Sequence, residues 1–253
     1  MINFGTGKLI AIPTNLADGT AITVPQPVIL STLQDISVDM SVETKTLYGS
    51  KRFPIAAGQG KGKIEIKAKH AEIDGGVYGS LFLGKASAAG IKAAVIDFAA
   101  TIPATPGPYT LTIAPPSSGT FVADLGVFNA TTGVQMTRVA SAPATGEYSL
   151  VVATGIYTFA AADQGKAITV SYEYTASAGG KVWTITNEQM GYSPSFAMLL
   201  QNGYDGKTLV CKFNKCISSQ FQLPLKSDDF SISDFNAEAF ADAAGNLGYV
   251  CII

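Results

Sequence analysis

Residues 35–70 read DISVDMSVETKTLYGSKRFPIAAGQGKGKIEIKAKH, and this stretch decides the fold class. Every second residue from Ile36 to Val42 is apolar, and the residues between them are polar or acidic. Residues 62–70 repeat the alternation, with Ile64, Ile66 and Ala68 separated by charged side chains. A period of two is that of a half-buried strand. We expect two strands that pair antiparallel, the acids of the first facing mostly lysines of the second.

The segment between these strands is basic and rich in glycine. Seven of the 17 lysines and arginines lie between Lys45 and Lys69. We expect Leu47–Lys61 to form a long loop. The run GQGKGK at 58–63 is not a phosphate-binding loop, because it lacks the spacing and the Ser or Thr of that motif and joins two strands.

The composition is poor in ions. Charged residues make up 14% of the 253 residues and apolar residues 47%, whereas charged residues form roughly a quarter of an ordinary soluble domain. No run reaches the ~18 apolar residues of a membrane-spanning helix. Cores of subunit interfaces are depleted in charge, so much of the surface is expected to be covered by other subunits. The alternative is a β-rich domain whose surface is neutral Thr, Ser and Gly.

The net charge argues against a nucleic-acid-binding protein. It is −2, with a pI of about 5.4, and this is not the footprint of a chain that grips phosphates. The start, MINFGTGKLIAIPTN, has no long apolar segment, so we expect no signal peptide.

Several further elements follow from the pattern. Residues 71–83 are expected to form a short helix with Ile73, Val77 and Leu81 on one face, and its glycines would permit close approach to a sheet. Residues 91–98 and 181–187 are read as strands. The run AAGNLG at 243–248 has the composition of a hairpin turn.

Residues 101–180 differ from the rest, with six charged residues in 80 positions. Short alternating segments recur there, the clearest being AITVSYEYT at 167–175. We therefore predict a mainly β protein with a core of 1–100 and 181–253. The segment 101–180 is predicted to be an inserted small β module of the sandwich type. The expected strands of the module are 109–113, 134–139, 148–153, 156–159 and 167–174.

Chemistry-bearing residues are sparse. His70 is the sole histidine, it ends a lysine-rich strand, and it is read as a surface or strand-end residue rather than a catalytic base. Cys211, Cys216 and Cys251 are read as buried thiols in a reducing compartment. We predict no enzyme, no catalytic residue, no cofactor and no metal site.

The order of segments resembles the major tail tube proteins of long-tailed bacteriophages with non-contractile tails. The resemblance rests on residues 35–70, the following HAEIDGGVYGSLFLG, and KTLVCKFNKCISSQFQLPLKSDDFSISDFNAEAFADAAGNLG at 207–248. Residues 146–175 look like a β module found in several phage virion proteins. The insertion at 101–180 departs from the pattern of a minimal tube subunit.

The resemblance implies a β-sandwich with one flanking α-helix. Subunits would form hexameric rings that stack into a hollow tube, through which DNA passes to the host without specific binding. The implied partners are copies of the chain itself, a tape measure protein, and tail terminator and tip proteins, with no membrane involved. The implied location is the tail of the virion, assembled in the host cytoplasm. The module is expected on the exterior, because it could not fit in a channel that passes a duplex.

Self-assembly by stacking requires mating surfaces on one chain. We expect the basic loop to dock on an acidic surface of an adjacent subunit, with Tyr48 and Phe53 of the loop as aromatic anchors. The alternative is that these charges only solvate a mobile loop. The expected loop residues are Tyr48, Lys51, Arg52, Phe53 and Lys61. The expected acidic residues are Asp228, Asp229, Asp234, Glu238 and Asp242.

Two further expectations concern the assembled particle. The lumen should be neutral to acidic, because a basic lining would bind DNA phosphates. The alternative function is that of a tail-tip or decoration protein whose 101–180 module binds a host surface.

Overall fold

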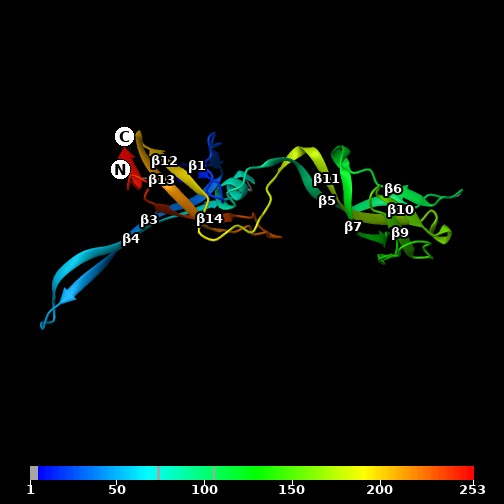
Figure 1. Cartoon of the computed structure of the whole chain (residues 1–253), viewed down its shortest axis with the longest axis horizontal. Coiled ribbons are helices and arrows are strands. Elements are labelled where there is room, and N and C mark those ends of the chain that lie inside the picture. The colour runs from blue at the N-terminus through cyan, green and yellow to red at the C-terminus, as the bar shows by residue number, and fades with distance from the viewer. Residues whose placement is uncertain (1–4, 73–74, 105) are drawn as a thin grey trace. The chain divides into compact units, whose positions relative to one another are not determined.

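The computed structural model describes residues 5–72, 75–104 and 106–253. The chain divides into two compact units, Met1–Ser87 with Trp183–Ile253, and Ala88–Val182 (Figure 1). Strands dominate both units, which confirms the mainly β prediction. No helix within these described ranges has the length and apolar character needed to span a bilayer.

The first unit is built on a single eight-stranded sheet. Its order is β2-β1-β12-β13-β14-β4-β3, and β15 also pairs with β13. The strands are β1 (Lys8–Asn15), β2 (Val28–Leu30), β3 (Leu33–Tyr48), β4 (Pro54–His70), β12 (Ser195–Tyr204), β13 (Lys207–Phe221), β14 (Ser233–Phe240) and β15 (Gly248–Ile252).

Strand β13 pairs with two different strands along one of its edges. Leu209–Phe213 pairs with β15, and Lys215–Phe221 pairs with β14. The turn at 243–248 therefore joins two strands that both lie against β13. The prediction that this turn closes a hairpin was wrong, because β14 and β15 do not pair with each other.

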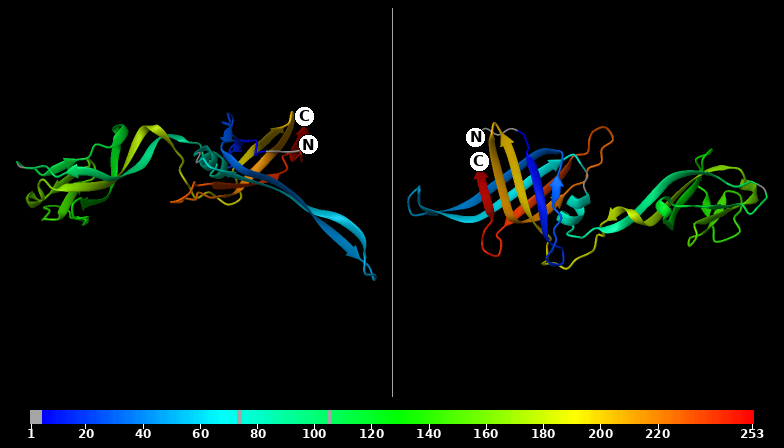
Figure 2. Two further views of the ribbon diagram at one scale, coloured as in Figure 1. Left: turned by 180° about the vertical axis from the view of Figure 1, so that it is seen from behind. Right: turned by 90° about the horizontal axis from the view of Figure 1, so that it is seen from above.

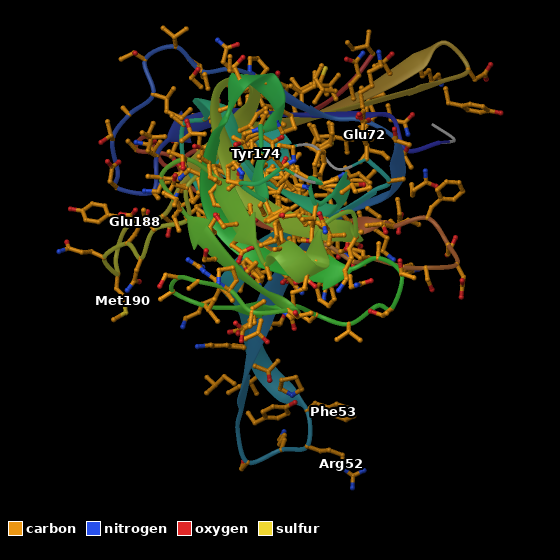
Figure 3. The ribbon with its side chains drawn as sticks, turned by 90° about the vertical axis from the view of Figure 1, so that its right-hand side faces the viewer. Arg52, Phe53, Glu72, Tyr174, Glu188 and Met190 are labelled. Atoms are coloured by element: carbon orange, nitrogen blue, oxygen red, sulfur yellow. The ribbon has the colours of Figure 1, made fainter. Side chains whose placement is uncertain are left out.

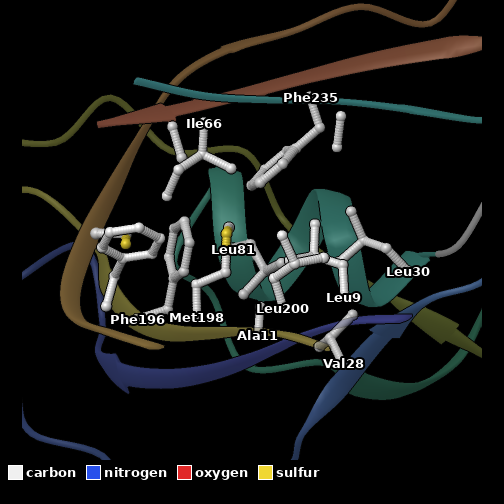
Figure 4. Packing of buried hydrophobic residues seen from close by; sticks show 14 of the residues in the cluster. Leu9, Ala11, Val28, Leu30, Ile66, Leu81, Phe196, Met198, Leu200 and Phe235 are labelled. Carbon is white, nitrogen blue, oxygen red and sulfur yellow. The ribbon is translucent and has the colours of Figure 1, made fainter. Parts of the chain in front are cut away.

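The core of the first unit lies between two parts of this sheet. Ile66 of β4 and Phe235 of β14 face Phe196 and Met198 of β12 across it, all four almost fully buried (Figure 4). The rings of Phe196 and Phe235 stand 5.9 Å apart between centroids. Each such side chain contributes about 1.5–3 kcal/mol on burial. The two layers belong to one continuous sheet, whereas a sandwich has two separate sheets.

The helical segment of this unit differs from the prediction. The described helix is η1 (Val77–Phe82), a short π-helix, where an α-helix over 71–83 was expected; Ile73 lies outside the described residues. Val77 and Leu81 point into the core, as predicted. The glycines of this segment were expected to allow close approach to a sheet, but the group that packs closely on Gly79 is the indole ring of Trp183. A Cβ on Gly79 would lie 1.8 Å from Cδ1 of Trp183. Of the strand expected over 181–187, only Lys181 and Val182 are in a strand, at the end of β11 (Ala167–Val182), and residues 183–187 form no strand.

The second unit is a sandwich of two small sheets. One has the order β5-β11-β7, with β5 (Ala88–Thr101), β7 (Thr120–Asn129) and β11 (Ala167–Val182). The other has the order β6-β10-β9-β8, with β6 (Thr110–Thr112), β8 (Thr137–Arg138), β9 (Glu147–Val151) and β10 (Ile156–Phe159). Two 3₁₀ turns, η2 (Pro116–Ser118) and η3 (Ala161–Asp163), complete it.

The alternation in AITVSYEYT was read correctly, since Ile168, Val170, Tyr172 and Tyr174 are all buried in the core of this module. The boundary of the module differs from the expected residue 101. Strand β5 pairs with β11 from Thr101 opposite Ala167 back to Ala88 opposite Val182. The module therefore begins at Ala88.

A buried carboxylate joins the two sheets of the module. Asp124 of β7 accepts hydrogen bonds from the hydroxyls of Tyr148 (2.7 Å) and Tyr157 (2.9 Å) and from the backbone N–H of Gly126 (3.1 Å). Burial, and then the hydrogen bond to this carboxylate, raises the pKa of both tyrosines. The network satisfies a charge that would otherwise be costly to bury.

Candidate assembly surface

Strands β3 and β4 form a hairpin arm that extends beyond the body of the first unit (Figure 1). Their pairing runs from Leu33 opposite His70 to Tyr48 opposite Pro54. The antiparallel pairing was predicted. The expected loop Leu47–Lys61 was too long, because most of it continues the two strands and only 49–53 form the turn.

The arm has no core of its own. Every residue from Asp39 to Lys63 is exposed. The apolar row of β3 begins inside, where Ile36 and Val38 pack against the core, and continues outward as exposed Met40 and Val42. The same apolar face thus passes from the interior of the protein onto a surface that this chain leaves uncovered.

The tip of the arm gathers aromatic and basic side chains (Figure 3). Tyr48 ends β3, and Phe53, which is 77% exposed, closes the turn. Lys51 and Arg52 lie between them and form no ion pair within the described part of the chain. The structure therefore brings together four of the five predicted basic-loop residues. The fifth, Lys61, stands on β4 beside a bulge, away from the tip.

The base of the arm carries an ion-pair ladder on its polar face. Lys63 Nζ lies 2.5 Å from Glu65 and 2.9 Å from Glu238, and Lys67 Nζ lies 3.3 Å from both Asp39 and Glu65. Hydrogen bonds from Lys63 and then Lys67 lower the pKa of Glu65, and those to Glu65 and then Glu238 raise the pKa of Lys63 to about 12. The register sets Asp39 opposite Glu65. The lysines therefore engage Glu65 along β4, and reach Glu238 and Asp39 diagonally on the neighbouring strands.

The five predicted acids do not form one free surface. Glu238 is paired with Lys63, and Asp234 stands opposite Lys69 on the neighbouring strand. Asp242 holds the turn before β15, where its carboxylate accepts from the backbone of Ala244 and Asn246. The backbone hydrogen bond from Asn246, and then the side-chain bond from Asn214, lower the pKa of Asp242. Only Asp228 and Asp229 remain in an exposed loop.

That loop, 222–232, joins β13 to β14 and has an apolar character that the sequence analysis missed. Leu225 is 80% exposed and Phe230 is 83% exposed. Lys226 lies 3.5 Å from Asp229, while Asp228 has no ion pair among the described residues. The signal was the run LPLKSDDF, in which large apolar residues flank two acids without a strand period.

Other reactive side chains lie away from this surface. His70 ends β4 as predicted but is 1% exposed, so its placement at the surface was wrong; its Nδ1 lies 2.7 Å from the carbonyl oxygen of Glu72. Cys211 and Cys216 are buried free thiols, but Cys251 is exposed, contrary to expectation. Burial raises the pKa of Cys216 to about 12. Within the described ranges no His, Cys, Asp and Glu side chains gather as a metal site would need.

Comparison with known proteins adds no relative. No protein-family model matches the chain, and no curated protein matches it. Inference about function therefore starts from the arm and its surroundings.

Proposed function

We propose that this chain is a structural virion protein whose copies form hexameric rings that stack into the hollow tail tube of a bacteriophage. The observation that carries the proposal is the arm. Its apolar row leaves the core and stays uncovered at Met40 and Val42, and large apolar side chains are exposed again near the tip, namely Leu47, Tyr48, Phe53 and Ile55. A soluble monomer rarely exposes a contiguous apolar surface without a partner. A second copy of the chain is the partner that the segment order in the sequence favours.

Strand β15 supports self-association from a second place. All of its residues are exposed, among them Tyr249, Val250 and Ile252, and it pairs on one side only, with β13. An apolar edge strand is a template for pairing with another chain. Together with the low content of ions, this indicates a surface that is buried on assembly.

The polar face at the base of the arm suits the lumen of such a tube. Two of its lysines, Lys63 and Lys67, are engaged by carboxylates of the same chain, those of Asp39, Glu65 and Glu238. A face whose basic groups are already neutralised releases few counterions from DNA and binds it weakly. We place this face toward the channel and the module Ala88–Val182 on the exterior.

Electron microscopy of the purified protein tests the proposal. Long hollow cylinders are the expected result. Replacement of Lys51 and Arg52 by Glu is expected to leave folded, soluble protein that no longer polymerises. Normal tubes from this variant would contradict a role of the tip in assembly.

The second candidate is a tail-tip or decoration protein, and the separate compactness of Ala88–Val182 is the observation in its favour. An independently packed module suits binding to a host surface. Discrete small oligomers in the same micrographs, with binding to host cells that is lost on removal of the module, would support this candidate over the tube.

A further inference from the structure

We propose that the arm tip of one copy, Tyr48 to Phe53, seats on loop 222–232 of another copy in a head-to-tail contact. This inference rests on the proposed function and identifies the acceptor of the arm. It follows from where the two segments lie and from what their side chains present.

The tip and the loop lie at opposite ends of the same strands. Strand β14 pairs with β4 so that Ser233 faces His70 and Glu238 faces Glu65. Loop 222–232 precedes Ser233 and so lies at the His70 end of β4, whereas the tip lies at its Pro54 end. The 17 residues of β4 separate them, roughly 50 Å at the rise of a strand. Figure 2 shows the arm and the loop leaving the first unit on different sides.

This separation excludes a contact within one copy and suits a contact between copies. A surface at one end that mates with a different surface at the other end is heterologous. Such a contact closes into a ring if the rotation between copies allows it, and otherwise repeats along one direction. The tip of each copy then reaches the loop of the next.

The two segments match in apolar character. Tyr48 and Phe53 are exposed at the tip, and Leu225 and Phe230 are exposed in the loop. Aromatic side chains enclosed by a partner are the usual source of binding energy in a small contact. Each set therefore offers exposed apolar side chains to the other.

The two segments also match in charge. Lys51 and Arg52 carry two positive charges at the tip, and loop 222–232 carries Asp228 and Asp229 against Lys226. Asp228 forms no ion pair with a cation of its own chain within the described residues. Of the other predicted acids, Glu238 is held by Lys63 and Asp242 by a turn, and Asp234 lies within β14 opposite Lys69 rather than in an exposed loop. Opposite charges here would select the register of the contact more than its strength.

Photo-crosslinking tests the contact directly. The full chain carries benzoylphenylalanine in place of Phe53, and assembled protein is made from a mixture of isotopically light and heavy copies. We expect crosslinks to 222–232 that join a light copy to a heavy one. Crosslinks that join segments of one copy, or that map to other segments, would overturn the assignment.

Charge reversal provides an independent test with a built-in rescue. K51E/R52E and D228K/D229K are each expected to lose assembly, because like charges then meet. The quadruple variant, with both ends reversed, is expected to recover it. All four side chains are exposed, so circular dichroism should show native fold in each variant. K8E/K207E, which reverses exposed lysines off the arm, is the matched control and should assemble normally.

The outcomes separate the two proposals. Wild-type protein that never forms higher assemblies, alone or with phage tail components, would refute the proposed function and this contact with it. Loss of assembly in K51E/R52E together with normal tubes from D228K/D229K would refute the acceptor and leave the tube intact. A quadruple variant that stays unassembled would also count against the pairing of these two segments.

Discussion

At the scale of single residues, Asp124 shows how a module with few charges keeps one in its core. The carboxylate lies between two sheets and draws a hydroxyl from each of two strands of the opposite sheet. Nothing local in TFVADLGVFN marks this aspartate as buried. Its partners come from β9 and β10, so the cluster exists only once the sheets have packed.

The tyrosines of this cluster predict a loss of stability in alkali. Their pKa is raised in the folded state, so the neutral hydroxyls contribute stability that is fully present below the ordinary value of 10.0 and falls as the pH rises above it. Thermal unfolding of the full chain, followed over a series of alkaline pH values, should show this decline. A Y148F/Y157F variant should be less stable at neutral pH but lose much less on going to alkali, and an equally steep decline in it would contradict the assignment.

Gly79 carries a second prediction at this scale. A Cβ there would overlap the indole of Trp183, and both groups are held by packing around η1. Gly79→Ala should cost about 1–3 kcal/mol in the free energy of unfolding. Gly58→Ala is the matched control, because its Cβ would meet no atom within 4 Å. Denaturant unfolding of both variants measures the two free energies of unfolding. Equal stabilities would argue against the close packing of the Trp183 indole on Gly79.

At the scale of elements, the arm shows what the sequence could and could not predict. Alternation over 35–46 and 62–70 predicted both strands and their pairing. It could not predict their extension to Tyr48 and Pro54, because GQGKG and a bulge interrupt the period. The same reason hid β7, whose pairing with β11 shifts register at Ser171 and at Glu173. The sequence analysis singled out the acids of loop 222–232 but did not identify Leu225 and Phe230 as exposed.

The exposed arm predicts that assembly and folding are separable. Removal of 45–58, with Thr44 joined to Gln59 by an Asn-Gly turn, keeps the register of the base of the arm. Because these residues pack against no core, stability should change by no more than about 0.5 kcal/mol. Assembly should be lost. Calorimetry and electron microscopy measure the two effects, and a large drop in melting temperature would show that the arm packs on its own chain.

At the scale of the whole molecule, the module enters and leaves through paired strands. Ala88 and Val182 are opposite each other at the ends of β5 and β11, so the two connections to the first unit lie side by side. This pairing explains why composition placed the boundary too late: 88–100 resembles the core in sequence but belongs to the module by hydrogen bonding. The carboxy-terminal boundary was close, because the SAGG run lies at a register shift only two residues before the paired ribbon ends at Val182.

Excision of the module tests its place in the particle. Joining Ser87 to Trp183 through two glycines should leave the first unit folded, because its core contains no residue of 88–182. Tubes should still form, and their outer diameter should shrink while the channel keeps its width. A wider channel in cryo-electron micrographs would place the module inside. If the excised variant stays monomeric and does not bind host cells, the result supports neither the tube nor the tail-tip function.

The opposition of arm tip and loop along β4 has a further consequence. An open array built on this contact is directional, with bare tips at one extremity and bare loops at the other. A protein that stops growth at the end with bare tips must therefore present a surface like the loop. One that stops growth at the other end must present a surface like the arm tip, so a single surface would not serve both ends.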